Sequence, residues 1–179
     1  MSEQLRGSFN LFFNPDSIAI IGSLRGGIFG GACLIENLHN FGFRGGIYPV
    51  NPSYNEVLGL RVYPSISDVP EGVELAVISA PAKVVPAIIK ECVGRGIKAA
   101  VIGADGFAER DEAGAKLQQE IVSIAKPAGM RLIGPNTVGV ANTRSGVITS
   151  AYELGSPGIG PGSISLGAQT GLVGPQAFP

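Results

Sequence analysis

The fold is decided by the stretch Asp16-Ser-Ile-Ala-Ile-Ile-Gly22-Ser-Leu-Arg-Gly-Gly-Ile-Phe-Gly-Gly31-Ala-Cys-Leu-Ile-Glu-Asn-Leu38. The apolar run at residues 18–21 predicts a strand buried on both faces, and a glycine-rich turn follows it. Leu34, Ile35 and Leu38 then recur at helical spacing. Glycine allows close approach of the backbone, and a helix N-terminus attracts anions. The stretch therefore predicts the phosphate-binding start of a nucleotide-binding α/β domain.

The glycine pattern departs from the dinucleotide fingerprint G-x-G-x-x-G, because Leu24 stands where the middle glycine belongs. The second predicted strand, residues 46–50, runs into Asn51 and carries no carboxylate for a ribose. A phosphate-bearing ligand is therefore favoured, and a nicotinamide-dependent oxidoreductase is a disfavoured alternative. A second alternative is that the glycines serve only tight packing of a strand against a helix.

Composition excludes several classes of protein. The 179 residues suffice for one domain and a fragment, with 13 basic and 14 acidic side chains and a net charge of −1. The sequence contains no basic tract, so we expect no nucleic-acid partner. Its apolar runs have only the length of strands, so we expect no membrane partner. Residues 1–8 lack the apolar core of a signal peptide. Cys33 and Cys92 suit a reducing compartment, so we expect a cytoplasmic protein.

Side chains for catalysis or metal binding are scarce. His39 is the single histidine, and the two cysteines lie far apart, so we expect no metal site. A serine nucleophile would lack a histidine partner, and we expect no catalytic residue in this chain. Arg25 is the cation nearest the glycine-rich turn and is a candidate phosphate contact.

Strand-like and helix-like segments alternate along the chain. Apolar runs of strand length lie at residues 18–21, 46–50, 75–79, 98–103 and 130–133, with a further short strand at residues 61–63. The later helices are expected at residues 81–93, with Val84 facing inward, and at residues 109–126. This alternation predicts an α/β fold, a Rossmann-like doubly wound parallel sheet, over residues 1–141. Residues 142–162, rich in Gly, Ser, Thr and Pro, are expected to form a linker or crossing segment before the start of a second domain at residues 163–179.

Each predicted strand leads into a turn of unusual composition. The turns lie at residues 22–31, 50–53, 80–82, 103–107 and 134–137. In a parallel sheet these turns share the carboxyl edge, where ligands bind, so they predict a common ligand cleft. Ordinary turn chemistry is the alternative for any one of them.

Five short motifs follow one another along the chain: Asn14-Pro15-Asp16-Ser17-Ile18-Ala19-Ile20-Ile21-Gly22, Ile47-Tyr48-Pro49-Val50-Asn51-Pro52, Tyr63-Pro64-Ser65-Ile66, Gly106-Phe107-Ala108-Glu109 and Gly134-Pro135-Asn136. In this order the chain resembles the CoA-binding domain of ADP-forming acyl-CoA synthetases, relatives of the succinyl-CoA synthetase α subunit. The resemblance implies a Rossmann-like CoA-binding domain followed by a flavodoxin-like, succinyl-CoA synthetase-like domain. It also implies conversion of acyl-CoA, ADP and phosphate into acid, CoA and ATP through an acyl phosphate and a phosphohistidine.

The resemblance assigns candidate residues to the parts of CoA. The CoA phosphates are expected at Gly22, Ser23, Leu24, Arg25 and Gly26, and the adenosine end at Val50, Asn51, Pro52 and Ser53. Further lining is expected from Ala80, Pro81, Gly103, Ala104 and Asp105. The thiol end and acyl group are expected at Gly134, Pro135 and Asn136. A phosphate-binding turn is expected at Gln169, Thr170 and Gly171. The same assignment predicts that Gly22→Val abolishes CoA binding by blocking the pyrophosphate.

Departures from the family pattern limit these expectations. Ser53 stands where relatives often have lysine, Thr137 replaces a common cysteine, and Ala168 replaces the first serine of the phosphate turn. The family's phosphohistidine is expected beyond residue 179. ATP or ADP and Mg²⁺ are expected to bind an ATP-grasp domain or subunit, in cis or in trans. The chain is thus expected to bind CoA, to be inactive alone, and to be a possible homo-oligomer. The alternative is a non-catalytic CoA-binding or regulatory module.

Overall fold

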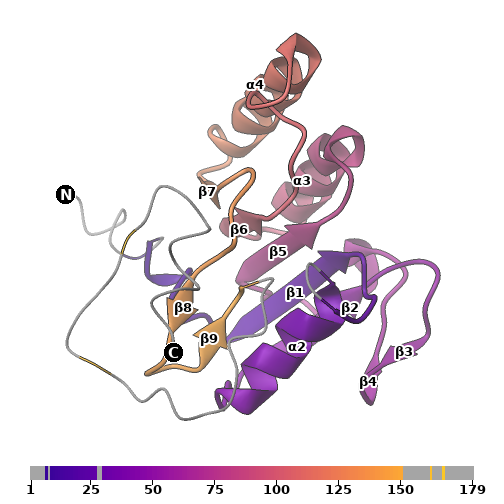
Figure 1. Ribbon diagram of the computed structural model, residues 1–179, viewed down its shortest axis with the longest axis vertical. Coiled ribbons are helices and arrows are strands. Elements are labelled where there is room, and N and C mark those ends of the chain that lie inside the picture. The colour runs from indigo at the N-terminus through magenta and orange to yellow at the C-terminus, as the bar shows by residue number, and fades with distance from the viewer. Residues whose placement is uncertain (1–6, 8, 28–29, 151–161, 163–166, 168–179) are drawn as a thin grey trace.

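The centre of the protein is a five-stranded parallel sheet with the strand order β2-β1-β5-β6-β7 (Figure 1). The computed structural model describes residue 7, residues 9–27 and 30–150, and residues 162 and 167. The strands of the sheet are β1 (Ser17–Gly22), β2 (Gly46–Val50), β5 (Leu75–Ser79), β6 (Ala99–Ile102) and β7 (Arg131–Ile133). The predicted doubly wound, Rossmann-like sheet is confirmed.

Both faces of the sheet are covered, which explains the continuous apolar runs of its central strands. Ile18 and Ile20 of β1 join an apolar cluster with α2 (Gly31–Asn40). Ala19 and Ile21 join a second cluster, formed with α3 (Val85–Gly94) and α4 (Glu112–Ala125). Figure 1 shows α3 and α4 on one side of the sheet and α2 on the other. Successive side chains of one strand thus serve two separate cores.

The helix limits differ from the sequence prediction at two places. A 3₁₀ turn, η2 (Ala82–Val84), follows Pro81, so α3 begins only at Val85 and Val84 is 46% exposed. The last helix begins at Glu112 because Asp111 caps it.

The connection from β2 to β5 carries small elements of its own. They are β3 (Glu56–Val57), β4 (Leu60–Arg61) and the 3₁₀ turn η1 (Ile66–Asp68). β3 and β4 pair as an antiparallel hairpin. The predicted strand at residues 61–63 is therefore shifted toward the hairpin, and Tyr63 forms only a single parallel bridge to Val50.

Residues 142–150, expected to open a linker, instead form packed structure. β8 (Ala141–Asn142) and β9 (Val147–Ile148) pair as an antiparallel hairpin, and residues 147–150 are buried. Asn37 of α2 donates from Nδ2 to the carbonyl of Ser150 at 3.0 Å, and the Ser145 hydroxyl donates to the carbonyl of Phe13 at 2.6 Å. Apart from residues 162 and 167, the chain after residue 150 lies outside the described residues, and the domain limits stay a prediction.

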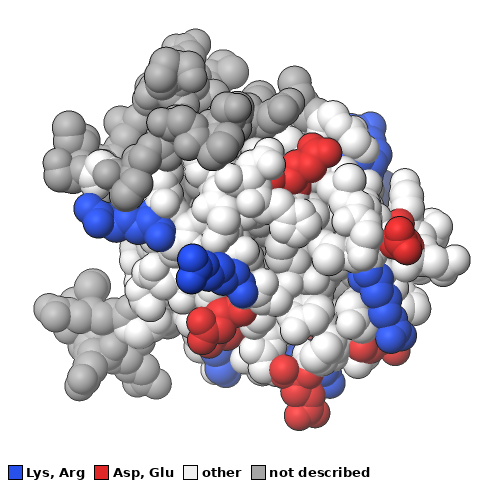
Figure 2. Space-filling model, turned by 90° about the horizontal axis from the view of Figure 1, so that it is seen from below, with Lys and Arg blue, Asp and Glu red and all other residues white. Residues whose placement is uncertain are grey.

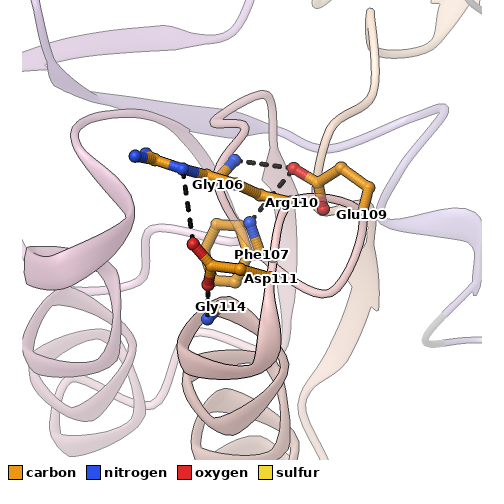
Figure 3. Close-up of polar contacts among 6 residues, drawn as sticks. All are labelled: Gly106, Phe107, Glu109, Arg110, Asp111 and Gly114. Atoms are coloured by element: carbon orange, nitrogen blue, oxygen red, sulfur yellow. Dashed lines mark hydrogen bonds and ion pairs between the residues drawn. The ribbon is translucent and has the colours of Figure 1, made fainter.

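The connection from β6 to α4 is held by its own carboxylates (Figure 3). Glu109 Oε1 accepts hydrogen bonds from the N–H groups of Gly106 at 2.6 Å and Phe107 at 3.0 Å. Asp111 Oδ1 accepts from the N–H of Gly114 at 2.7 Å and so caps α4. Desolvation raises the pKa of Glu109, but hydrogen bonds from the main-chain N–H groups of Phe107, Glu109 and Gly106 outweigh it and hold the pKa below its ordinary value.

Gly22 ends β1 where the chain passes very close to β5. Its φ is +116°, and a Cβ at this position would collide with the main-chain carbonyl of Ser79. The loss of CoA binding expected for Gly22→Val stays a prediction, and the structure adds that the new side chain would first collide with the protein itself.

We expect Gly22→Val to lower the free energy of unfolding by about 3 kcal/mol, because it combines backbone strain with this collision. Urea unfolding measures the change. Gly26→Val is the matched control, since a Cβ at Gly26 has no neighbour within 4 Å and its φ is not left-handed. An unchanged urea midpoint for Gly22→Val would contradict the close approach of β1 and β5.

Glu109→Gln should lower the melting temperature by roughly 1–3 °C near neutral pH, because the amide accepts the two N–H groups without a charge. A carboxyl whose folded pKa is lowered stabilises the fold above its unfolded pKa and loses this effect as pH falls through the folded value. The difference from the parent should therefore vanish under acidic conditions.

Thermal melts of the parent and Glu109→Gln across the acidic range measure this convergence. Glu120→Gln, on the exposed side of α4, removes one equal charge as a control. A gap between parent and Glu109→Gln that stays constant with pH would refute the role of the carboxylate.

Candidate functional site

The structure brings the five predicted turns together along the carboxyl edge of the sheet. Hydrogen bonds join each turn to the next strand or turn of the row. Asn51 Nδ2 donates to the Gly22 carbonyl at 2.7 Å, and Ser23 N–H donates to the Ser79 carbonyl at 2.8 Å. Further along the edge, Gly103 N–H donates to the Ile78 carbonyl at 3.0 Å and Asn136 N–H donates to the Ala104 carbonyl at 2.8 Å. The turns are thus one connected edge.

The glycine-rich turn faces two ways. Leu24, which replaces the middle glycine of the fingerprint, is 2% exposed and packs in the cluster beneath α2. Only its main chain is therefore available to a ligand, whereas Arg25 and Gly26 are exposed. The middle glycine of the fingerprint is replaced by leucine because the side chain at this position points into the core. The spacing of the glycines alone does not reveal this.

The start of α2 lies tightly against the same turn. Gly31 N–H donates to the Ser23 carbonyl at 2.7 Å, and a Cβ on Gly30 or Gly31 would collide with the carbonyl of Arg25 or Ser23. Gly30 is the N-cap and supplies no side-chain cap, and the first turn of α2 contains no acidic residue. The positive end of the α2 dipole therefore carries no carboxylate of that first turn.

The start of α4 lies at the same edge but differs from that of α2 in the groups that its N–H donors bind. Its orphan N–H groups and those of the preceding loop bind Asp111 and Glu109 (Figure 3). An external anion would have to displace these carboxylates, so α2 offers the more favourable anion site of the two.

Arg110 is a cation at this edge that the sequence reasoning missed. It pairs with Asp111 at 3.6 Å, and its guanidinium lies 3.7 Å from the position that a Cβ on Gly106 would occupy. Its side chain is 74% exposed, so it can turn toward a ligand phosphate. In the sequence, Arg110 could have been found from its position directly after the Gly106-Phe107-Ala108-Glu109 motif.

At the end of β2, Val50 is buried, while Pro52 and Ser53 are exposed. Asn51 is half-buried, and both ends of its amide bind the protein, since Oδ1 also accepts from Ser53 N–H at 2.8 Å. The sequence reasoning placed Asn51 against the ligand and did not foresee these internal bonds.

The remaining described candidates line the middle and far side of the edge. Pro81, Gly103, Asp105 and Asn136 are exposed, whereas Ala80, Ala104 and Pro135 are half-buried. Asn136 has a left-handed φ of 53° and follows a cis Gly134–Pro135 bond. Gln169, Thr170 and Gly171 lie outside the described residues.

Cys33 lies in the first turn of α2, at this edge, but its side chain is buried, whereas Cys92 and His39 lie toward the far ends of their helices. Cys33 and Cys92 are buried in helices, and burial raises the pKa of the Cys92 thiol to about 12, which removes it as a nucleophile. His39 is exposed in the last turn of α2, the end opposite the glycine turn. Within the described ranges, no three His, Cys, Asp or Glu side chains gather as a metal site.

Charge is evenly distributed on the face in Figure 2, where basic and acidic side chains are interspersed among uncharged residues. This agrees with the net charge of −1. Among the helices that the structure describes, none has the length and apolar character needed to cross a membrane.

Comparison with known proteins agrees with this geometry. The sequence model of the family described as "CoA binding domain" matches residues 16–143. The chain is 47% identical over 160 residues to the ADP-forming acetate–CoA ligase II of Archaeoglobus fulgidus, covering 89% of this chain and 24% of the relative. It is 38% identical over 172 residues to the α subunit of the ADP-forming acetate–CoA ligase I of Pyrococcus furiosus, covering 93% of this chain and 36% of that subunit.

A solved structure gives the same picture. The dinucleotide-forming acetyl-coenzyme A synthetase 1 of Candidatus Korarchaeum cryptofilum, in complex with phosphate and ADP, matches with a TM-score of 0.78 and 33% identity. The match covers 95% of this chain and 36% of that one. The chain thus spans about a quarter to a third of the length of these relatives. With its parallel sheet and row of turns, this chain belongs to the CoA-binding domain family found in ADP-forming acetate–CoA ligases.

Proposed function

We propose that this chain binds CoA or an acyl-CoA along the carboxyl edge of its sheet. The observation that carries the proposal is the connected row of five turns, with the start of α2 free of an acidic residue in its first turn. A pyrophosphate is a dianion, and the N-terminal end of a helix with a close glycine turn suits it. Arg25, in the glycine-rich turn, and Arg110, in the connection from β6 to α4, supply exposed cations.

The remaining parts of CoA follow the order of the strands. The main chain at residues 22–26 would hold the phosphates, and residues 50–53 would hold the adenosine end. Ala80, Pro81 and residues 103–105 would line the cofactor toward β7. Pro135 and Asn136 would face the thiol and the acyl group. Gln169, Thr170 and Gly171 would bind the phosphate that is exchanged.

The larger activity proposed is that of an ADP-forming acyl-CoA synthetase, of which this chain is the CoA-binding part. Relatives that are named as α subunits support a partner domain or subunit. That partner would be an ATP-grasp domain carrying ADP or ATP with Mg²⁺, and the compartment would be the cytoplasm. His39, the only histidine, lies roughly 12 Å along α2 from Gly31 at the far end of the helix. A phosphohistidine relay would therefore use a residue outside this chain.

We expect Gly26→Val to weaken CoA binding about 10-fold or more while leaving the fold intact. A side chain at Gly26 has open space around it, so it would occupy the volume that the pyrophosphate approaches. Isothermal titration calorimetry with CoA measures the loss. Gly94→Val is the matched control, because its Cβ also meets no neighbour and it lies at the end of α3.

A parent protein that folds but binds no CoA would overturn the proposed function. Equal affinity of the parent and Gly26→Val would place the pyrophosphate elsewhere. NAD is the competitor in a parallel titration, and displacement of CoA by NAD at similar concentration would favour a dinucleotide site instead.

We expect the 179-residue chain to form no ATP from acetyl-CoA, ADP, Mg²⁺ and phosphate, because phosphoryl transfer needs positioned cations and a phosphoryl carrier. Luciferase detection of ATP measures turnover, and an ADP-forming acetate–CoA ligase is the positive control. ATP formed above a no-protein blank, in a preparation without kinase activity, would show that this chain holds a phosphoryl carrier.

A further inference from the structure

We propose that Asn51 is a positioning residue that fixes the first peptide of the glycine turn, and that it acts on CoA through that peptide. The inference rests on the proposed CoA site and adds a role to one residue of it. Its starting point is the hydrogen bond from Asn51 Nδ2 to the Gly22 carbonyl, which joins the ends of β2 and β1 at 2.7 Å.

The peptide between Gly22 and Ser23 is held from both sides. Its carbonyl oxygen accepts from Asn51, and its N–H donates to the Ser79 carbonyl at 2.8 Å. β1 lies between β2 and β5 in the sheet, so the two bonds pull on the peptide from its two neighbouring strands. Because φ at Gly22 is +116°, the orientation of the Gly22–Ser23 peptide plane sets the direction in which the turn leaves β1.

Asn51 is itself anchored before it reaches Gly22. Its main-chain N–H donates to the Tyr63 carbonyl at 2.9 Å, and its Oδ1 accepts from Ser53 N–H at 2.8 Å. The bond to Ser53 also fixes which end of the amide faces Gly22, because Oδ1 must point toward the N–H and Nδ2 toward the carbonyl. The residue is therefore a prearranged bridge.

The chemistry at this position requires a donor. Dinucleotide-binding domains carry a carboxylate here, and a carboxylate is an acceptor that would repel the Gly22 carbonyl. An amide satisfies the carbonyl without adding negative charge beside a pyrophosphate. Asn51 thereby favours a fixed phosphate-binding turn over the ribose contact of a dinucleotide.

The test uses Asn51→Asp in the full 179-residue chain. Near pH 8 the ionised carboxylate cannot donate to Gly22, so CoA affinity should be about 10-fold or more below that of the parent. When the carboxyl is protonated it regains a donor, so the ratio of the two dissociation constants should fall toward about 2 near pH 4, the ordinary range of an aspartic carboxyl. The parent, titrated in parallel under the same conditions, corrects for the ionisation of CoA over this range.

Two controls separate positioning from other effects. Asn55→Asp adds the same charge in an exposed part of the same connection and should leave CoA affinity within about 2-fold. Dephospho-CoA keeps the pyrophosphate and lacks the phosphate on the ribose. Action through the turn predicts equal fold-losses for CoA and dephospho-CoA, and a loss confined to CoA would overturn the proposal in favour of direct contact with the ribose phosphate.

The parent protein provides a second measurement if Asn51→Asp does not fold. The side-chain amide protons of Asn51 should exchange with solvent at least about 10-fold more slowly than those of exposed Asn55, with and without CoA, by NMR. Equal exchange rates, or an Asn51→Asp variant with the parent's affinity at every pH, would overturn the bridge. A folded parent that binds neither CoA nor dephospho-CoA would refute the proposed function instead.

Discussion

The close approach of β1 to β5 at Gly22 is the constraint on which the rest of the edge depends. No side chain fits between this residue and the Ser79 carbonyl, so the chain leaves β1 in a left-handed conformation that favours glycine. Ser23 N–H then reaches Ser79, Leu24 turns into the core, and Gly31 closes the turn on Ser23. The start of α2 is thereby placed at the carboxyl edge, beside the ends of β2 and β5.

Electrostatics distinguish the two helices that begin at this edge. α4 and its preceding loop bind their own carboxylates, Asp111 and Glu109, and the pKa of Glu109 is lowered as a consequence. α2 starts with glycines and has no acidic residue in its first turn, so the positive end of its dipole suits a ligand that brings its own negative charge. One sheet edge thus combines a loop fixed by internal anions with a turn suited to an external one.

Much of this arrangement could be predicted from the sequence, because the signals were local. The apolar runs at Ile18, Leu75 and Ala99 gave the parallel sheet, and the turns that follow them were placed on one edge. The start of α4 was placed three residues early, since a capping Asp111 after Glu109 is hard to distinguish from a helical first turn. The β8–β9 hairpin was missed because its glycine- and serine-rich composition is that of a linker, whereas its structure depends on distant partners such as Asn37 and Phe13. Asn51 shows the same limit, since its bridge to Gly22 spans 29 residues of sequence.

We propose above that the glycine turn and the start of α2 hold the pyrophosphate of CoA. The most direct measurement is a titration of ¹⁵N-labelled protein with CoA followed by main-chain amide shifts. We expect the largest shifts at residues 23–27 and 30–33 and smaller shifts at residues 51–53, 103–105 and 135–136. Little change is expected at Gly106 and Phe107, whose amides already bind Glu109. Largest shifts at Gly106 and Phe107, with residues 23–33 unmoved, would contradict this proposal.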